Sequence, residues 1–138
     1  MTKEERIQKA VALFKEGYNC SQSVVGAYAD MYGFTFEQAL HMAASFGGGI
    51  GRMREICGAA CGMFLLAGLE RCAVEGADRE GKAANYKLVQ ELAEKFKEEC
   101  GTIHCSELLG LSRPFCIISR HPMSIILISS CLSSVRNS

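Results

Sequence analysis

Apolar residues recur every three or four positions along most of residues 2–110, which is the period of amphipathic α-helices. Capping residues divide this pattern into segments, because Thr and Asn side chains satisfy the unpaired N–H groups at a helix start. The sequence therefore predicts three N-terminal helices, at about 2–16, 20–31 and 35–45. Their expected capping residues are Thr2, Asn19 and Thr35.

A fourth helix is predicted at about 55–69 and is apolar almost all round, so we expect it to be buried at the centre. A glycine-rich loop at 47–51 precedes it. Gly58 and Gly62 are four residues apart and so share one helix face, where a neighbouring helix can approach closely. The segment is too short and too closely flanked by charge to span a membrane.

A polar loop at 70–82 and a fifth helix at about 82–100 are expected next, followed by a short helical segment after Cys105. The packing face predicted for the fifth helix is Tyr86, Val89, Ala93, Phe96 and Cys100. By the same criterion the first helix buries Ile7, Ala10, Val11 and Phe14. The predicted fold class is all-α: a compact bundle of about five helices around a central, buried, glycine-rich helix.

The composition changes after residue 111. Residues 112–138 contain eight serines and no Asp, Glu or Lys, and the run SIILISSCL at 124–132 resembles a strand more than a helix. We therefore expect a helical, cysteine-rich domain at 1–111 and an irregular C-terminal tail at 112–138.

The charge balance limits the class of partner. With 15 basic and 15 acidic residues the formal net charge is zero, which argues against nucleic-acid binding through bulk charge. The N-terminus is charged and amphipathic and lacks the apolar region of a signal peptide. We therefore expect a cytoplasmic location and no membrane insertion.

Eight cysteines in 138 residues are more than ordinary usage explains. In a reducing compartment such richness is typical of metal binding or thiol redox chemistry. No CxxC pair is present, and no spacing matches a standard zinc finger. Cys20 and Cys57 are each expected at the start of a helix, where the partial positive charge favours a thiolate, and Arg52 and Arg54 would add positive potential at Cys57.

Four motifs occur in a characteristic order: NCSQS at 19–23, FGGGIGR at 46–52, CGAACG at 57–62 and CSELLG at 105–110. Together they resemble the C_GCAxxG_C_C family of small redox-active proteins, which has a CGAxxG motif and four characteristic cysteines. The resemblance covers about residues 5–111 and implies a redox role.

Carried over by motif, Cys20, Cys57 and Cys105 match the first three family cysteines. Cys61 stands at a variable position of CGAxxG and is an addition in this chain. Cys131 and Cys116 are the two candidates for the fourth family cysteine, and Cys131 is the better match by its distance from Cys105.

Three functions are compatible with these residues. In a thiol redox protein, Cys57 attacks a disulfide or oxidant and Cys20 or Cys105 resolves the intermediate, with a partner protein or small thiol supplying electrons. In the alternative, thiolates hold an iron–sulfur cluster or zinc, and the candidate ligands are Cys20, Cys57, Cys61, Cys105 and Cys131. The third function is a non-catalytic helical interaction module.

Both thiol chemistries require Cys20, Cys57 and Cys105 to converge. Cys72 and Cys100 are expected to be structural. His104 is interpreted as a solvated turn residue, and the glycine loop as a tight turn rather than a phosphate cradle. A homodimer remains an open expectation, and the family resemblance allows an association with a transporter system.

Overall fold

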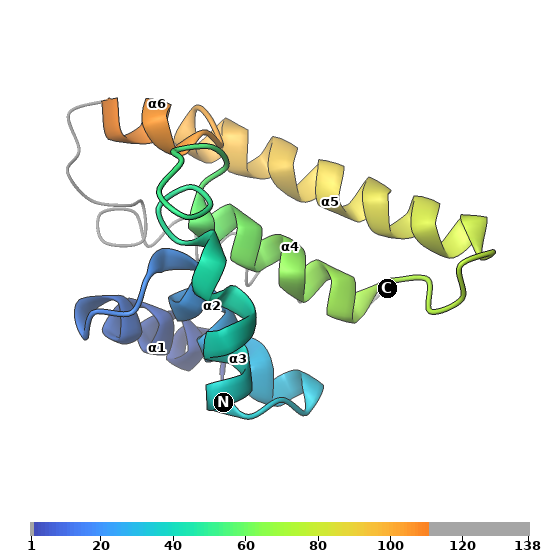
Figure 1. Cartoon of the computed structure of the whole chain (residues 1–138), viewed down its shortest axis with the longest axis horizontal. Coiled ribbons are helices and arrows are strands. Elements are labelled where there is room, and N and C mark those ends of the chain that lie inside the picture. Colours follow the sequence, from blue (N-terminus) through green and yellow to red (C-terminus); the bar gives the residue numbers. More distant parts are fainter. Residues whose placement is uncertain (1, 111–138) are drawn as a thin grey trace.

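The computed structural model describes residues 2–110 and confirms the all-α class (Figure 1). Its elements are α1 (Lys3–Lys15), α2 (Cys20–Tyr28), η1 (Ala29–Tyr32), α3 (Phe36–Ala43), η2 (Ala44–Phe46), α4 (Gly58–Glu70), α5 (Arg79–Cys100) and α6 (Cys105–Gly110), where η denotes a 3₁₀ helix. Over these residues the sole β pairing is an isolated antiparallel bridge between Ile56 and His104. None of the described helices is long and apolar enough to cross a membrane.

Side-chain caps begin the first three helices, as the sequence predicts. Thr2, Asn19 and Thr35 each accept a hydrogen bond from the N–H group three residues later, and the side chain of that later residue accepts one in return. These reciprocal bonds satisfy N–H groups that a helix start otherwise leaves unpaired. Gly33 and Gly101 end η1 and α5 with φ of 81° and 88°, a conformation that favours glycine.

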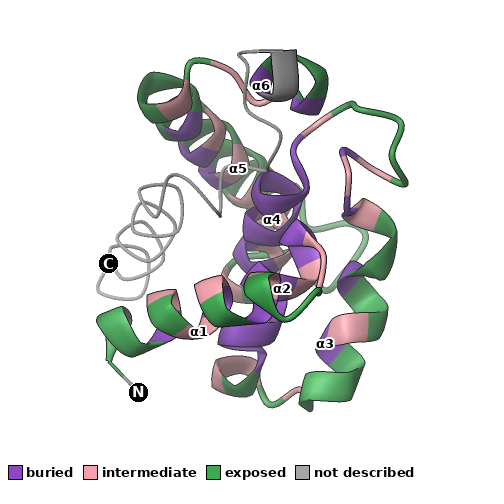
Figure 2. Ribbon diagram, turned by 90° about the vertical axis from the view of Figure 1, so that its left-hand side faces the viewer, coloured by how far each residue is buried: buried purple, intermediate pink, exposed green. Residues whose placement is uncertain are grey.

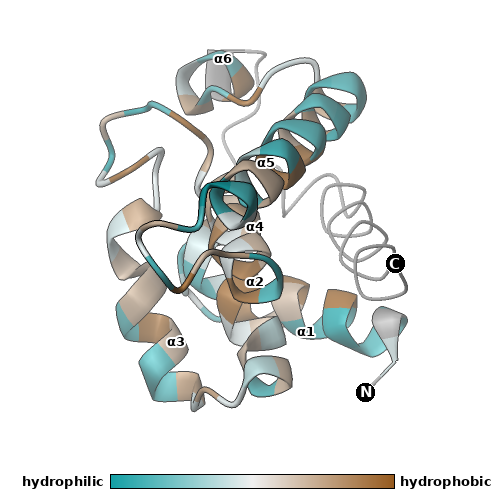
Figure 3. Cartoon of the chain, turned by 90° about the vertical axis from the view of Figure 1, so that its right-hand side faces the viewer, coloured by the Kyte–Doolittle hydropathy of each residue, from teal (hydrophilic) through white to brown (hydrophobic). Residues whose placement is uncertain are grey.

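Helix α2 packs against α1, α3 and α4, and α4 also packs against α5. Figure 1 shows α4 lying between α5 and the group formed by α1, α2 and α3. Buried residues are concentrated on α2 and α4 (Figure 2). By contrast, α5 is strongly hydrophilic along its outer side (Figure 3). The main core therefore lies where α2 and α4 meet, and Phe96 of α5 is fully buried against it.

Three helix boundaries differ from the predicted ones. The second helix is α-helical only to Tyr28 and tightens into η1 before Gly33. Helix α4 begins at Gly58, so Cys57 is its N-cap and not part of its first turn. Helix α5 begins at Arg79, inside the predicted loop, because the Asp78 side chain accepts a hydrogen bond from the N–H of Gly81 and caps the helix earlier.

The buried stripe of α5 is also shifted from the predicted face. Leu88, Leu92 and Phe96 are its buried residues, so the prediction is correct for Phe96, and Val89 and Cys100 pack against the core as predicted. Tyr86 is 59% exposed, so its assignment to the packing face was wrong. The two stripes are neighbours on the helix surface, and packing against α4 selects the one with larger aliphatic side chains. On α1 the prediction is correct for Ala10; Ile7, Val11 and Phe14 are half-buried, and Leu13 is buried instead.

A nearly buried arginine joins α1 to the end of α2. The Arg6 guanidinium donates to the carbonyl of Ala27 at 2.8 Å and to both Asp30 carboxylate oxygens at 2.7 and 3.2 Å. Its charged plane also lies 5.6 Å from the centre of the Tyr28 ring. A fork-shaped guanidinium suits this two-point recognition of a carboxylate. These contacts fix the angle at which α1 crosses α2.

Asp30→Asn should lower stability at neutral pH and have little effect in acid. The hydrogen bond from Arg6, aided by its charge, holds the pKa of Asp30 below the ordinary value of 3.8. A carboxyl with a lowered folded-state pKa stabilises the protein above its unfolded pKa, and this stability disappears as the pH falls through the folded value. Urea unfolding should show a loss on the order of 1 kcal/mol at pH 7. An equal loss at pH 7 and at pH 2 would contradict the ion pair.

Candidate functional site

Cys57 stands at the junction of the glycine-rich loop and α4. It is the N-cap of α4, is 1% exposed, and has an extended backbone with φ of −52° and ψ of 133°. One turn later, the N–H of Cys61 donates to the carbonyl of Cys57 at 2.9 Å. The positive end of a thirteen-residue helix therefore lies at Cys57.

Cys20 lies against the first residue of α4 because that residue is glycine. Cys20 is the first residue of α2 and is 5% exposed. A Cβ atom on Gly58 would be 2.5 Å from the Cys20 sulfur and 2.7 Å from the carbonyl oxygen of Phe46. No real Cβ is found so close to such atoms, so only glycine permits this approach. The sulfur of Cys20 is thereby placed beside the residue that follows Cys57.

Cys105 is brought to the same end of α4 by the bridge between Ile56 and His104. The N–H of Cys57 donates to the carbonyl of Ile103 at 2.7 Å, and the N–H of Cys105 donates to the carbonyl of Glu55 at 2.6 Å. In this antiparallel register, Cys57 and Cys105 are diagonal neighbours on the same face of the two bridged segments. Diagonal neighbours are about 7–8 Å apart, at or just beyond the separation of about 7 Å that a disulfide spans without backbone movement.

The loop at 47–55 has a tight, unusual backbone. Gly48, Gly49, Ile50, Gly51 and Arg52 all have φ between 58° and 73°, and Arg54 has φ of 61°. Left-handed backbone costs about 1–2 kcal/mol for each residue that is not glycine. A β-branched residue such as Ile50 is an outlier there. The loop therefore keeps a strained shape that the surrounding contacts must stabilise.

Hydrogen bonds within the loop use many of its N–H groups. Those of residues 50, 52, 53, 54 and 55 donate to carbonyls of residues 46, 47, 50, 48 and 49, respectively. An anion cradle needs such donors pointing outward. The arrangement therefore favours the tight turn over the phosphate cradle. Gly49 sits beneath the Cys105 segment, where an added Cβ would be 2.6 Å from the Cys105 Cβ.

Arg54 contacts Cys105, whereas the sequence assigned its charge to Cys57. One guanidinium nitrogen of Arg54 lies 3.6 Å from the Cys105 sulfur, within hydrogen-bonding distance for sulfur. The carbonyl of Arg54 also accepts from the N–H of Ser106 at 3.3 Å. This contact could not be predicted from local periodicity, because it depends on the pairing of residues 54–57 with 103–106. The three adjacent glycines at 47–49 were the only feature of the sequence that indicated a close approach to this loop.

Cys61 is a buried thiol with a raised pKa. Burial, followed by the proximity of Cys57 and of Cys20, raises the pKa of Cys61 to about 11. Its sulfur lies 3.8 Å from the carbonyl oxygen of Ile56, to which the thiol can donate. Cys61 is therefore a protonated thiol at neutral pH and a poor nucleophile.

Stability should fall in alkali between about pH 9 and pH 11 through Cys61. Its folded-state pKa of about 11 lies above the ordinary value of 9.0, so the unfolded chain loses this proton first and unfolding becomes more favourable. Cys61→Ala should make the stability curve flatter over this range. Denaturant unfolding of both proteins at pH 8 and pH 10.5, with reductant present, measures the difference. Parallel losses in the two proteins would argue against the raised pKa.

The other cysteines and His104 differ in how far they are exposed, where the structure describes them. Cys72 is exposed, and Cys100 is half-buried against the core. His104 is exposed, in line with its interpretation as a solvated turn residue. Cys116 and Cys131, the candidates for the fourth family cysteine, lie outside the described residues.

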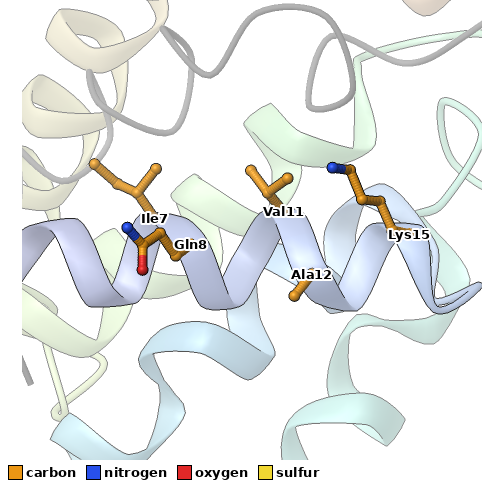
Figure 4. A pocket seen from close by; sticks show the side chains of 5 residues that line it. All are labelled: Ile7, Gln8, Val11, Ala12 and Lys15. Atoms are coloured by element: carbon orange, nitrogen blue, oxygen red, sulfur yellow. The ribbon is translucent and has the colours of Figure 1, made fainter.

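Within residues 2–110, no three His, Cys, Asp or Glu side chains are arranged to hold a metal ion. Because Cys131 lies outside these residues, a site that includes it stays a prediction. A surface cavity of about 390 Å³ lies on α1, away from the cysteines, and is lined by Ile7, Gln8, Val11, Ala12 and Lys15. Figure 4 shows Ile7, Val11 and Lys15 pointing to the same side of the helix.

Fold and site together define a small helical protein with clustered, buried cysteines at one end of an apolar helix. Residues 18–136 match the family described as "Putative redox-active protein (C_GCAxxG_C_C)". The chain belongs to this family, as its motifs indicate, and the match continues through most of the C-terminal segment that follows residue 111. Neither the curated proteins nor the solved structures contain a match to this chain.

Proposed function

We propose that this protein carries out thiol–disulfide exchange with Cys20, Cys57 and Cys105 as its reacting sulfurs. The observation that carries the proposal is the approach of the Cys20 sulfur to Gly58, which leaves room for a sulfur directly beside Cys57. The bridge between residues 56 and 104 supports it by holding Cys105 diagonally from Cys57. The redox description of the family agrees with this chemistry.

The reaction transfers two electrons from the protein to an external disulfide. A thiolate of the site attacks one sulfur of the disulfide, whose S–S bond breaks and whose other sulfur leaves as a thiolate that takes up a proton. A second thiolate of the site then attacks the protein sulfur of the mixed disulfide and releases the second external thiol. Cys57 and either Cys20 or Cys105 end as a disulfide, and the external disulfide ends as two thiols.

The surroundings of Cys57 and Cys61 favour different roles for these two sulfurs in the exchange reaction. The positive end of α4 favours the thiolate form of Cys57. Cys61 keeps its proton because its pKa is raised to about 11, so it is not expected to attack. A small thiol or a partner protein in the cytoplasm would return the electrons.

Mild oxidation tests the proposal. The reduced protein, treated with one equivalent of a small disulfide and then denatured, should have lost two thiols. Cys57→Ser should lose none to an internal disulfide, while Cys72→Ser, which removes an exposed thiol, should behave as the wild type. Full retention of thiols in the wild-type protein would rule out the proposed exchange.

A further inference from the structure

Two exposed arginines lie in the strained loop that precedes Cys57, and one of them, Arg54, contacts the Cys105 sulfur. Arg52 and Arg54 are both exposed. None of the ion pairs found within residues 2–110 involves either of them. Their charges are therefore available to a ligand, although Glu55, next to Arg54, and Glu107, two residues after Cys105, are exposed acidic groups.

The loop fixes the backbone of both arginines before any ligand binds. The N–H of Arg52 donates to Gly47 at 3.2 Å, and the N–H of Arg54 donates to Gly48 at 3.3 Å. Both residues keep left-handed backbone, with φ of 64° and 61°. A preorganised loop loses less entropy on binding than a flexible one.

Cys105 is the thiol of the site that a guanidinium contacts, and it is buried. It is 8% exposed, compared with 1% for Cys57 and 5% for Cys20. Cys61 is equally exposed, but its raised pKa keeps it protonated. Arg54 touches the Cys105 sulfur, so a group bound to the guanidinium arrives next to this sulfur.

We propose that Arg52 and Arg54 recognise the negative charge of an anionic disulfide, and that Cys105 is the sulfur such a disulfide meets first. The inference rests on the proposed exchange chemistry and adds to it a substrate class and an order of attack. The Cys105 thiolate attacks the disulfide, whose distal sulfur leaves as a thiolate. The Cys57 thiolate then attacks the Cys105 sulfur and releases the second anionic thiol. Arg54 is a specificity residue that also positions Cys105.

The experiment compares three disulfides in a Cys72→Ser background, which removes an exposed thiol. Dithiobis(nitrobenzoate) is anionic, dithiodipyridine is neutral and cystamine is cationic. The rate of mixed-disulfide formation is measured at neutral pH and low salt for the Arg52→Gln and Arg54→Gln variants, and peptide mass mapping identifies the modified cysteine. Arg79→Gln, which removes an exposed arginine at the start of α5, is the matched control. For each probe, the rate of a variant is divided by the rate of its parent, so that differences in intrinsic reactivity among the three disulfides do not affect the comparison.

Each Gln variant should lower the rate with the anionic probe by about two- to fivefold more than the rate with cystamine, as expected for exposed charge pairs. The difference should shrink at high salt, and the first modified residue should be Cys105. Equal changes with all three probes, or first modification at Cys57, would overturn the inference while leaving the exchange chemistry intact. Failure of every probe to modify Cys20, Cys57 or Cys105 would overturn both.

Discussion

Gly58→Ala is expected to destabilise the protein and to disrupt the cysteine cluster in one step. The new Cβ would lie 2.5 Å from the Cys20 sulfur and 2.7 Å from the carbonyl oxygen of Phe46. The Phe46 oxygen belongs to the main chain and cannot rotate away, so α2 or the loop must move. Overpacking of this kind costs about 1–3 kcal/mol. Denaturant unfolding under reducing conditions measures this loss, and thiol titration after mild oxidation measures the effect on exchange.

Gly68→Ala is the matched control in the same helix. A Cβ on Gly68 would have no neighbour within 4 Å. Since alanine favours helix over glycine, this variant should be unchanged or more stable by up to about 1 kcal/mol. Adding Cys20→Ala to Gly58→Ala should restore part of the stability, because one of the two clashing atoms is removed. A Gly58→Ala protein as stable and as reactive as the wild type would show that Cys20 does not lie against α4.

Gly49→Ala is the second substitution with a large expected effect. Its Cβ would be 2.6 Å from the Cβ of Cys105 and 2.8 Å from the Cα of Arg54, and Gly49 has φ of 73°. The clash and the left-handed backbone should together cost about 2–4 kcal/mol. Because the loop would separate from the Cys105 segment, exchange at Cys105 should slow as well. Urea unfolding and the rate of mixed-disulfide formation report the two effects.

Gly51→Ala separates the cost of the left-handed backbone from the cost of the steric clash. Gly51 also has a left-handed backbone, with φ of 58°, but the nearest atom to an added Cβ is the carbonyl oxygen of Ser45 at 3.9 Å. It should therefore lose only about 1–2 kcal/mol, the cost of the backbone conformation, and keep its reactivity at Cys105. Equal stability losses for the two variants would mean that Gly49 does not support Cys105.

Local sequence patterns determine most of the helices of this fold. The caps at Thr2, Asn19 and Thr35 act within three or four residues, so they could be read directly and are confirmed. The start of α5 was missed because Asp78 caps it within a stretch rich in glycine and charge. Its buried face was displaced because packing against α4, rather than the helix period alone, decides which of two neighbouring stripes is covered.

The geometry of the candidate site could be predicted only in part from the sequence. The motifs single out Cys20, Cys57 and Cys105, and the glycine at position 58 indicates a close approach. Which sulfur Arg54 contacts depends on pairing between segments about fifty residues apart, and this pairing leaves no period in the sequence. The raised pKa of Cys61 likewise depends on burial and on neighbours from another helix.

The central claim is that Cys57 forms a disulfide with Cys20 or Cys105 when the protein reduces an external disulfide. The most direct measurement is mass spectrometric mapping of peptides from the oxidised native protein after its remaining thiols are alkylated. The proposed function predicts a peptide pair joined through Cys57 and either Cys20 or Cys105, with Cys61 alkylated only after unfolding. If Cys57 is recovered as a thiol while the external disulfide is consumed, or is joined only to Cys72 or Cys100, the claim is wrong.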